Sequence, residues 1–139
     1  MRFVLTAISG NKYDGDVYEV VLPTLDGRIG VMEDHMPLFS VISTGAISVR
    51  KNAHDPDSAM EHFATYGGAI EVSDNILRVL VDEANLPEEI NEQEAREAMV
   101  RAEKMKAEAK DQTSLEHAQA LLDRQSTRLQ VAALRHRRH

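Results

Sequence analysis

The chain of 139 residues contains no cysteine. This absence excludes disulfides, thiolate metal sites and cysteine nucleophiles, and nothing suggests secretion into an oxidising compartment. No apolar run approaches the roughly 18 residues that a membrane span needs. The N-terminal apolar stretch ends at Gly10, which is too early for a signal peptide. The sequence therefore predicts a soluble protein in the cytoplasm.

Basic residues are also few: 16 lysines and arginines stand against 23 aspartates and glutamates, which gives a net charge of −7. Generic nucleic-acid binding needs a basic surface that neutralises phosphates, so the net negative charge argues against this class of function.

The length suits one compact domain of about 80 to 90 residues with an appendage, and it excludes a large multidomain enzyme.

Glycine, proline and aromatic residues are all missing from residues 88–139. Glycine and proline mark turns, whereas their absence lets a helix continue. We therefore expect a boundary near Pro87, with one domain over residues 1–86 and a second over 87–139. The charge divides at about the same point: residues 1–84 carry the whole −7, residues 85–139 are neutral, and the last twelve carry +4.

The first domain has short apolar and β-branched segments with turn residues roughly every 8 to 12 positions. Because no helical pattern lies between these segments, the spacing predicts an antiparallel sandwich or barrel. Gly67-Gly68 is interpreted as a turn. The expected strands are Phe3–Ile8, Val17–Leu22, Ile29–Met32, Leu38–Ile42, Ala46–Arg50, His62–Tyr66, Ala69–Val72 and Ile76–Val81.

The second domain has the spacing of two amphipathic helices, and its short connection at about 110–112 predicts an antiparallel two-helix hairpin. The fold class is thus α+β, a β-sandwich followed by this hairpin. Asn91 with Glu94 fits a capping box and predicts a helix start near 91, and Thr113 with Glu116 predicts another near 113. The first helix presents mainly alanine, whose methyl group contributes only about 0.8 kcal/mol when buried. The pattern leaves open whether the hairpin stays packed or switches.

Motifs for catalysis and phosphate binding are absent. The chain has neither G-x-x-x-x-G-K-[ST] nor G-x-G-x-x-G, and its histidines lack a metal-ligand spacing. We therefore expect no active site, no metal and no cofactor. The basic end of the chain fits contact with an acidic partner as well as a simple response to the helix dipole. Two other functions stay open: a ligand-binding β-barrel that oligomerises through its helices, and an ATP-sensing module.

Four segments carry a recognisable pattern: Asp14–Pro23 (DGDVYEVVLP), Asp26–Leu38 (DGRIGVMEDHMPL), Gly67–Asn75 (GGAIEVSDN) and Val79–Ala84 (VLVDEA). In this order, ahead of a two-helix tail, they resemble the epsilon subunit of the F-type ATP synthase. The resemblance implies a β-sandwich with a helical hairpin, and a non-catalytic rotor subunit that binds the gamma subunit and the c-ring. It further implies coupling of ring rotation to the catalytic head, and inhibition of ATP hydrolysis by the C-terminal helices.

The resemblance also implies partner contacts. The turn Asp26-Gly27-Arg28 matches the segment that touches the c-ring, with Arg28 in place of an acid. His35 matches a histidine near gamma, with Asp34 in place of the preceding glycine. Basic residues of the second helix meet an acidic segment of the catalytic beta subunit when the hairpin extends; the candidates are Arg124, Arg128, Arg135, Arg137 and Arg138. The implied location is the cytoplasmic face of the bacterial inner membrane, as a peripheral part of the complex.

Some family members bind ATP through I-D-x-x-R-A at the first helix. This chain keeps Ile90 and Ala95, but Asn91 stands in the place of the acid and Glu94 in the place of the arginine. A carboxylate repels phosphate where a guanidinium attracts it. ATP is therefore only a weak alternative, and its candidate residues are Ile90, Asn91, Ala95, Arg101, Arg124 and Arg128.

Overall fold

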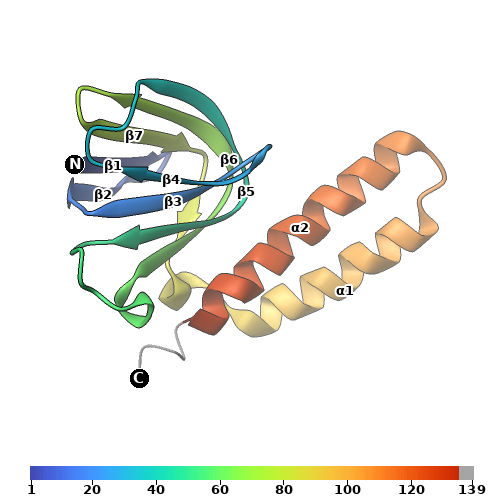
Figure 1. The fold of residues 1–139 in the computed structure, drawn as a ribbon. Coiled ribbons are helices and arrows are strands. Elements are labelled where there is room, and N and C mark those ends of the chain that lie inside the picture. The colour runs from blue at the N-terminus through green and yellow to red at the C-terminus, as the bar shows by residue number, and fades with distance from the viewer. Residues whose placement is uncertain (135–139) are drawn as a thin grey trace.

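The computed structural model describes residues 1–134 and arranges them as strands followed by helices (Figure 1). The α+β order expected from the sequence is confirmed. The strands are β1 (Arg2–Ala7), β2 (Gly10–Asp16), β3 (Glu19–Thr24), β4 (Gly27–Met32), β5 (Leu38–Arg50), β6 (Glu61–Ser73), β7 (Ile76–Val81) and β8 (Ala84–Asn85). Two short 3-10 turns, η1 (Asp57–Ala59) and η2 (Pro87–Glu89), precede the helices α1 (Glu92–Glu108) and α2 (Gln112–Leu134).

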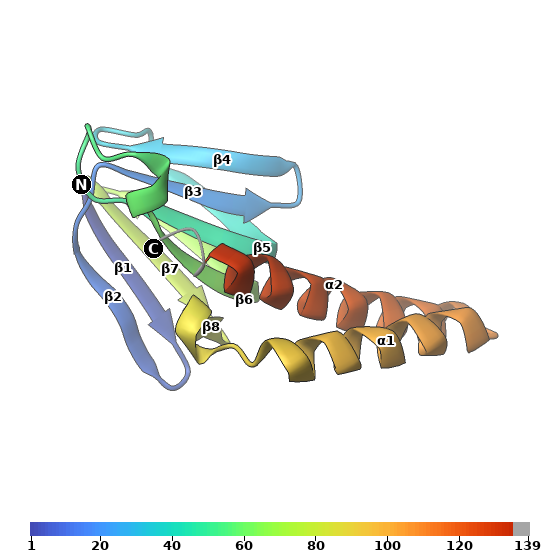
Figure 2. The same cartoon turned by 90° about the horizontal axis from the view of Figure 1, so that it is seen from below.

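The strands form one sheet that folds over on itself into a sandwich (Figures 1 and 2). Their order is β2-β1-β7-β6-β5-β3-β4, and β8 pairs with β6. The two longest strands, β5 and β6, have 13 residues each and pair with each other along most of their length. Because β5 also pairs with β3 and β6 also pairs with β7, these two strands join the layers.

Four of the predicted strands are halves of two long ones, so the prediction of a turn at Gly67-Gly68 is wrong. Both glycines lie inside β6, with positive φ angles of 128° and 156°. A Cβ atom on Gly68 would lie 2.3 Å from the carbonyl oxygen of Leu80 in β7. Only glycine allows this close approach, and the pair therefore bends a strand instead of ending one.

The edge strand β2 was not predicted. Its sequence, GNKYDGD, is rich in glycine, asparagine and aspartate, which have low β propensity, and its side chains are largely exposed. In addition, β1 pairs antiparallel with β2 but parallel with β7. The sheet is therefore mixed, and the expectation of a wholly antiparallel sandwich is corrected at this one pair.

The interior of the sandwich is filled by large side chains from both layers. The largest of those fully buried are Phe3, Phe63, Leu5, Leu22, Ile42, Ile47, Ile70 and Leu77. Tyr13 closes the core from β2 and packs against Phe3 and Phe63, with ring centroids 5.2 Å and 6.3 Å away. A ligand-binding barrel would need an open apolar cavity at this place, and the packed core opposes that alternative.

The two helices begin close to the predicted positions. Asn91 caps α1, because its side-chain oxygen accepts a hydrogen bond from the backbone N–H of Glu94 at 3.0 Å. The cap of α2 is Asp111, which accepts from the N–H of Ser114 at 2.7 Å. The helix thus starts just before Thr113, and the prediction that Thr113 is the cap is wrong.

The hairpin packs on the sandwich through α2. This helix contacts β5 and β6, and α1 packs on α2 (Figure 1). The tip of the hairpin points away from the strands, as both views show (Figure 2). Within residues 1–134, no helix is long and apolar enough to span a membrane.

Candidate functional site

Five polar residues connect the hairpin to the sandwich, and we call them the docking cluster: Tyr66, Glu83, Asn85, Arg124 and Arg128. Tyr66 comes from the middle of β6, and Glu83 and Asn85 lie at β8, which pairs with β6. The two arginines are four residues apart on α2, so they lie on the same helical face one turn from each other. The cluster forms where α2 crosses β6 and β8.

The guanidinium of Arg124 makes two different contacts with the sandwich. It forms an ion pair with the carboxylate of Glu83, in which one Nη donates to Oε2. Its Cζ atom also lies 3.9 Å from the centroid of the Tyr66 ring. Stacking of this kind adds a cation–π attraction to the ion pair. Both contacts tie the same side chain to the strands.

Arg128 completes the cluster through hydrogen bonds. Its Nη1 atom donates to the hydroxyl oxygen of Tyr66 at 3.3 Å and to Oδ1 of Asn85 at 3.1 Å. The Tyr66 hydroxyl donates to the same Oδ1 at 2.6 Å. The amide group of Asn85 in turn donates to Glu83 at 3.4 Å. The five side chains therefore form one connected polar network.

Burial and charge shift two pKa values in the docking cluster. Burial raises the pKa of the Tyr66 hydroxyl, and the hydrogen bond from Arg128 opposes this effect only in part. For Glu83 burial also acts to raise the pKa, but the hydrogen bond and positive charge of Arg124 outweigh it, so that the pKa is lowered. At neutral pH, Tyr66 is thus a hydroxyl donor and Glu83 a carboxylate.

The apolar part of the same contact is small. Its buried members are Ala64 of β6, Ile90 before α1, and Val131 and Ala132 of α2, with Ala46 and Tyr66 packed against them. Three of these six residues are alanines, and each buried methyl contributes only about 0.8 kcal/mol. The polar docking cluster therefore has a large share in holding α2 on the sandwich.

A surface pocket of about 540 Å³ lies beside the docking cluster, between the two helices and the strands. Four of the six ATP candidates line it: Ala95, Arg101, Arg124 and Arg128. The other two do not, because Ile90 is buried in the apolar contact and Asn91 caps α1. Glu83, Glu94 and Glu97 also line the pocket, so it holds three carboxylates and three guanidinium groups.

The predicted c-ring turn connects β3 to β4. Asp26 and Gly27 are exposed there, next to Leu25, which is 78% exposed. Arg28 is also exposed, but its guanidinium folds back toward β5, where it donates to the carbonyl oxygen of Ala46 at 3.0 Å. Burial lowers the pKa of its guanidinium, which nevertheless stays charged at neutral pH. The residue that differs from the family's acid is therefore bound to its own sheet.

His35 lies in the loop between β4 and β5, and its Nδ1 atom is 2.7 Å from the carbonyl oxygen of Met36. The preceding Asp34 has a φ angle of 61°, in the left-handed region that favours glycine. The family resemblance described above implies glycine at this position. The N–H of Asp34 donates to the side chain of Asn75, which fixes the loop against the β6–β7 turn.

An exposed apolar row crosses the outer face of three strands after this loop. It consists of Phe39 and Val41 of β5, Ala69 of β6 and Leu80 of β7, and we call it the outer apolar row. Val41 pairs with Ala69, which pairs with Leu80. Phe39 is 82% exposed and Leu80 is 62% exposed. Large exposed apolar side chains that gather on one face of a sheet favour a protein–protein interface.

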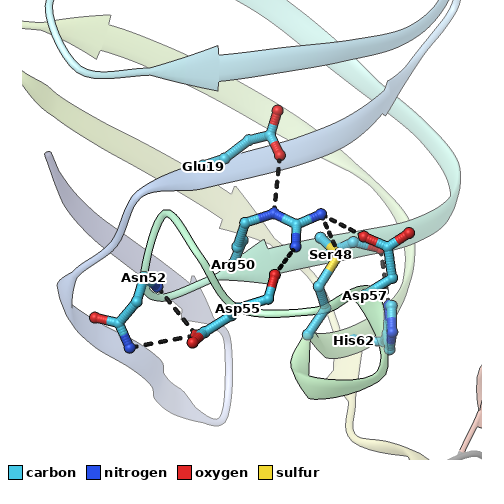
Figure 3. Close-up of polar contacts among 8 residues, drawn as sticks. Glu19, Ser48, Arg50, Asn52, Asp55, Asp57 and His62 are labelled. Atoms are coloured by element: carbon cyan, nitrogen blue, oxygen red, sulfur yellow. Dashed lines mark hydrogen bonds and ion pairs between the residues drawn. The ribbon is translucent and has the colours of Figure 1, made fainter.

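A second polar cluster surrounds Arg50 at the end of β5 (Figure 3). Its guanidinium pairs with Glu19 and Asp57 and donates to the backbone oxygen of Asp55. Nearby, the Ser48 hydroxyl lies 2.9 Å from Nδ1 of His62. The contacts of Arg50 hold the β5–β6 connection in place.

No group of three or more histidine, aspartate or glutamate side chains within residues 1–134 could hold a metal ion.

Sequence reasoning missed Tyr66, Asn85 and the outer apolar row, and it assigned no role to Glu83. The only available signal for Glu83 was its place in the recognised segment Val79–Ala84. Arg135, Arg137 and Arg138 lie outside the described residues. Arg124 and Arg128 are brought together, and both face the sandwich.

Comparisons with known proteins agree with the architecture. A family model described as "ATP synthase, Delta/Epsilon chain, beta-sandwich domain" matches residues 1–87. The ATP synthase epsilon chain of Halalkalibacterium halodurans is 34% identical over 124 residues, which cover 88% of this chain and 90% of the relative. That of Gloeobacter violaceus is 34% identical over 134 residues, covering 95% and 98%.

Two solved structures share the fold. One is a chain of the mitochondrial ATP synthase of Euglena gracilis, described as OSCP/F1/c-ring in rotational state 1, with a TM-score of 0.79 and 19% identity over 94% of this chain and 79% of that chain. The other is a chain of the central stalk/c-ring of the Tetrahymena thermophila enzyme, with a TM-score of 0.60 and 16% identity over 96% and 93%. At these identities the likeness concerns the fold alone.

Proposed function

The chain belongs to the epsilon-chain family of ATP synthase, and from this premise we propose that it is a non-catalytic rotor subunit in the central stalk of an F-type enzyme. The observation that carries the proposal is 34% identity along both the sandwich and the hairpin. In this role the chain binds the gamma subunit and the c-ring and couples ring rotation to the catalytic head. It is then a peripheral part of the complex on the cytoplasmic face of a bacterial inner membrane.

The gamma subunit is the partner that we assign to the outer apolar row. His35, which matches the family's histidine near gamma, lies on the loop that leads directly into Phe39 and Val41. A polar loop followed by exposed apolar side chains has the form of an interface core with a polar rim. The exposed turn around Asp26 and Gly27 is the corresponding surface for the c-ring.

Copurification tests the gamma assignment. Leu80→Glu places a charge in the outer apolar row and should reduce gamma bound to the tagged chain by at least roughly tenfold, because a buried unpaired charge opposes association. Val100→Glu on α1 is the matched control, since Val100 is 64% exposed and Leu80 is 62% exposed. If the two variants retain gamma equally, the outer apolar row is not the gamma interface. If the unmodified chain copurifies with neither gamma nor the c-ring, the rotor assignment is wrong.

We further propose that the C-terminal helices inhibit ATP hydrolysis. The basic residues of α2, including Arg124 and Arg128, would bind an acidic segment of the catalytic beta subunit after leaving the sandwich. Deletion of residues 88–139 should preserve assembly and coupled synthesis and should raise ATP hydrolysis by the complex. Equal hydrolysis by the shortened and intact complexes, at all nucleotide levels and proton gradients, would exclude the inhibitory role and leave the rotor role standing.

A further inference from the structure

The docking cluster already contacts the two arginines that a ligand or partner would use, Arg124 and Arg128. We propose that Glu83, Tyr66 and Asn85 hold the hairpin closed without a nucleotide, and that Glu83 is the internal competitor of an acidic partner segment for Arg124. The first part stands on the isolated chain alone. The second part rests on the proposed inhibitory function.

The pocket beside the docking cluster is balanced in charge without any ligand. Three carboxylates line it together with three guanidinium groups: Glu83, Glu94, Glu97, Arg101, Arg124 and Arg128. A triphosphate needs cations that are not already matched, because its own charges must be compensated on leaving water. Here it would enter a neutral pocket and lie beside Glu94 and Glu97. The charges of the pocket therefore balance one another without a bound nucleotide.

One guanidinium nitrogen of each arginine is engaged in the closed hairpin. Arg124 uses its edge for the Glu83 carboxylate and its face for the Tyr66 ring. Arg128 directs Nη1 at two oxygen atoms, those of Tyr66 and Asn85. A nucleotide would therefore have to displace contacts that exist already, and it would leave Glu83 without its cation.

The same contacts exclude a partner. The Arg124 nitrogen that donates to Glu83, and the guanidinium face that stacks on Tyr66, are not available to another chain while the hairpin is closed. An acidic partner segment that binds the arginines only after their release shifts the equilibrium toward the open hairpin. It must compete with Glu83 for Arg124. Weakening that internal pair should therefore make the hairpin easier to open.

Hydrogen exchange of the full-length chain tests the first part. Peptides from α2 report opening of the hairpin, and peptides from β7 report the sandwich as an internal reference. We expect Glu83→Gln to speed the exchange of α2 amides by roughly three- to fivefold and to leave β7 unchanged, as the loss of one partly exposed ion pair implies. Adding ATP at about 1 mM, far above a micromolar Kd, should change the α2 rates of the unmodified chain by less than about twofold.

Glu97→Gln is the matched control. It removes the same charge from the same pocket, but the hydrogen-bond partner of Glu97 is Gln93 on its own helix. Its α2 exchange should stay within about twofold of the unmodified chain. If the two variants exchange α2 equally, or if ATP slows α2 exchange by about tenfold, the hairpin is not closed in the way proposed.

The inhibitory part has its own measurement. In the assembled complex, Glu83→Gln should lower ATP hydrolysis relative to Glu97→Gln, because more of the hairpin is free to bind the acidic segment. If Glu83→Gln and Glu97→Gln hydrolyse ATP equally although α2 still exchanges faster in Glu83→Gln, Glu83 does not compete with the partner segment. The proposal that the hairpin closes without a nucleotide would then still hold. If the unmodified chain failed to copurify with gamma, the rotor assignment would be wrong, but the exchange result on the isolated chain would still stand.

Discussion

At Gly68 the backbone of β6 comes so close to β7 that a side chain has no place. A Cβ atom there would lie 2.3 Å from the oxygen of Leu80 and 2.8 Å from a methyl carbon of Val81, at a φ of 156°. Gly15 in the edge strand has no such restriction, since its nearest atom would be 3.7 Å away on the Tyr13 ring. The position of Gly15 can therefore accept a side chain, whereas that of Gly68 cannot.

Gly68→Ala should therefore lower the free energy of unfolding by at least about 2 kcal/mol, because either the strand or its neighbour must shift. Gly15→Ala should stay within about 0.5 kcal/mol of the unmodified chain. Urea denaturation followed by circular dichroism measures both. Equal midpoints for the two variants would contradict the close approach at Gly68.

Glu83 makes docking of the hairpin dependent on pH. Its pKa is lowered in the closed chain, because Arg124 outweighs the effect of burial, so the open form binds the proton more tightly. The contribution of Glu83 to docking is therefore complete above its ordinary pKa of about 4.3 and is lost as the pH falls below it. Amide protection of α2, corrected for intrinsic exchange, should decline over this range more steeply than in Glu83→Gln. Parallel profiles would show that other carboxylates cause the decline.

At the scale of elements, the helices were easier to predict than the strands. Capping uses residues three apart in the sequence, so Asn91 and Glu94 revealed the start of α1 directly. A long bent strand has no local signal that separates it from two short ones. Gly67 and Gly68 looked like a turn, but both lie inside β6, where Gly68 lets β7 approach closely. Gly45 likewise lies inside β5, where a Cβ atom would meet Pro23 at 2.8 Å.

The two predicted caps give a direct comparison. Asn91→Ala should destabilise the first turn of α1 by about 1 kcal/mol, because the N–H of Glu94 loses its acceptor. Thr113→Ala should have an effect within about 0.5 kcal/mol, because Asp111 is the cap of α2. Residue-level amide exchange by NMR would measure both changes. A larger effect at Thr113 would contradict the assignment of Asp111.

At the scale of the whole molecule, the core of the sandwich is made without the hairpin. Its buried residues run from Phe3 to Ala84, and the apolar contact with α2 is a separate, smaller cluster. A chain that ends at residue 87 should therefore fold cooperatively and keep the near-ultraviolet contribution of the packed Tyr13 ring, whereas that of Tyr66 changes because its contacts with α2 are lost. Thermal unfolding followed by circular dichroism would measure this. Loss of the cooperative transition would mean that the hairpin is part of the folding unit.

The candidate site could be predicted only in part, because it joins segments that are distant in the sequence. Arg124 and Arg128 were identified as basic residues of the second helix only through the family resemblance. Their acceptors Tyr66 and Asn85 belong to β6 and β8, and only the fold brings them near α2. No local pattern marks a tyrosine whose hydroxyl and ring both serve arginines. The outer apolar row was missed for the same reason, since its members come from three strands.

The position of Tyr66 gives the molecule a built-in optical reporter. The chain has no tryptophan and only three tyrosines, so tyrosine dominates its ultraviolet absorption and emission. Of these three, Tyr66 has its ring under Arg124 and its hydroxyl bonded to Asn85. When α2 leaves the strands, this chromophore loses its contacts with Arg124 and Arg128 and becomes exposed to water, while its bond to Asn85 stays within the strands. The opening of the hairpin can thus be followed in unlabelled protein, as a spectral change that Tyr66→Phe abolishes.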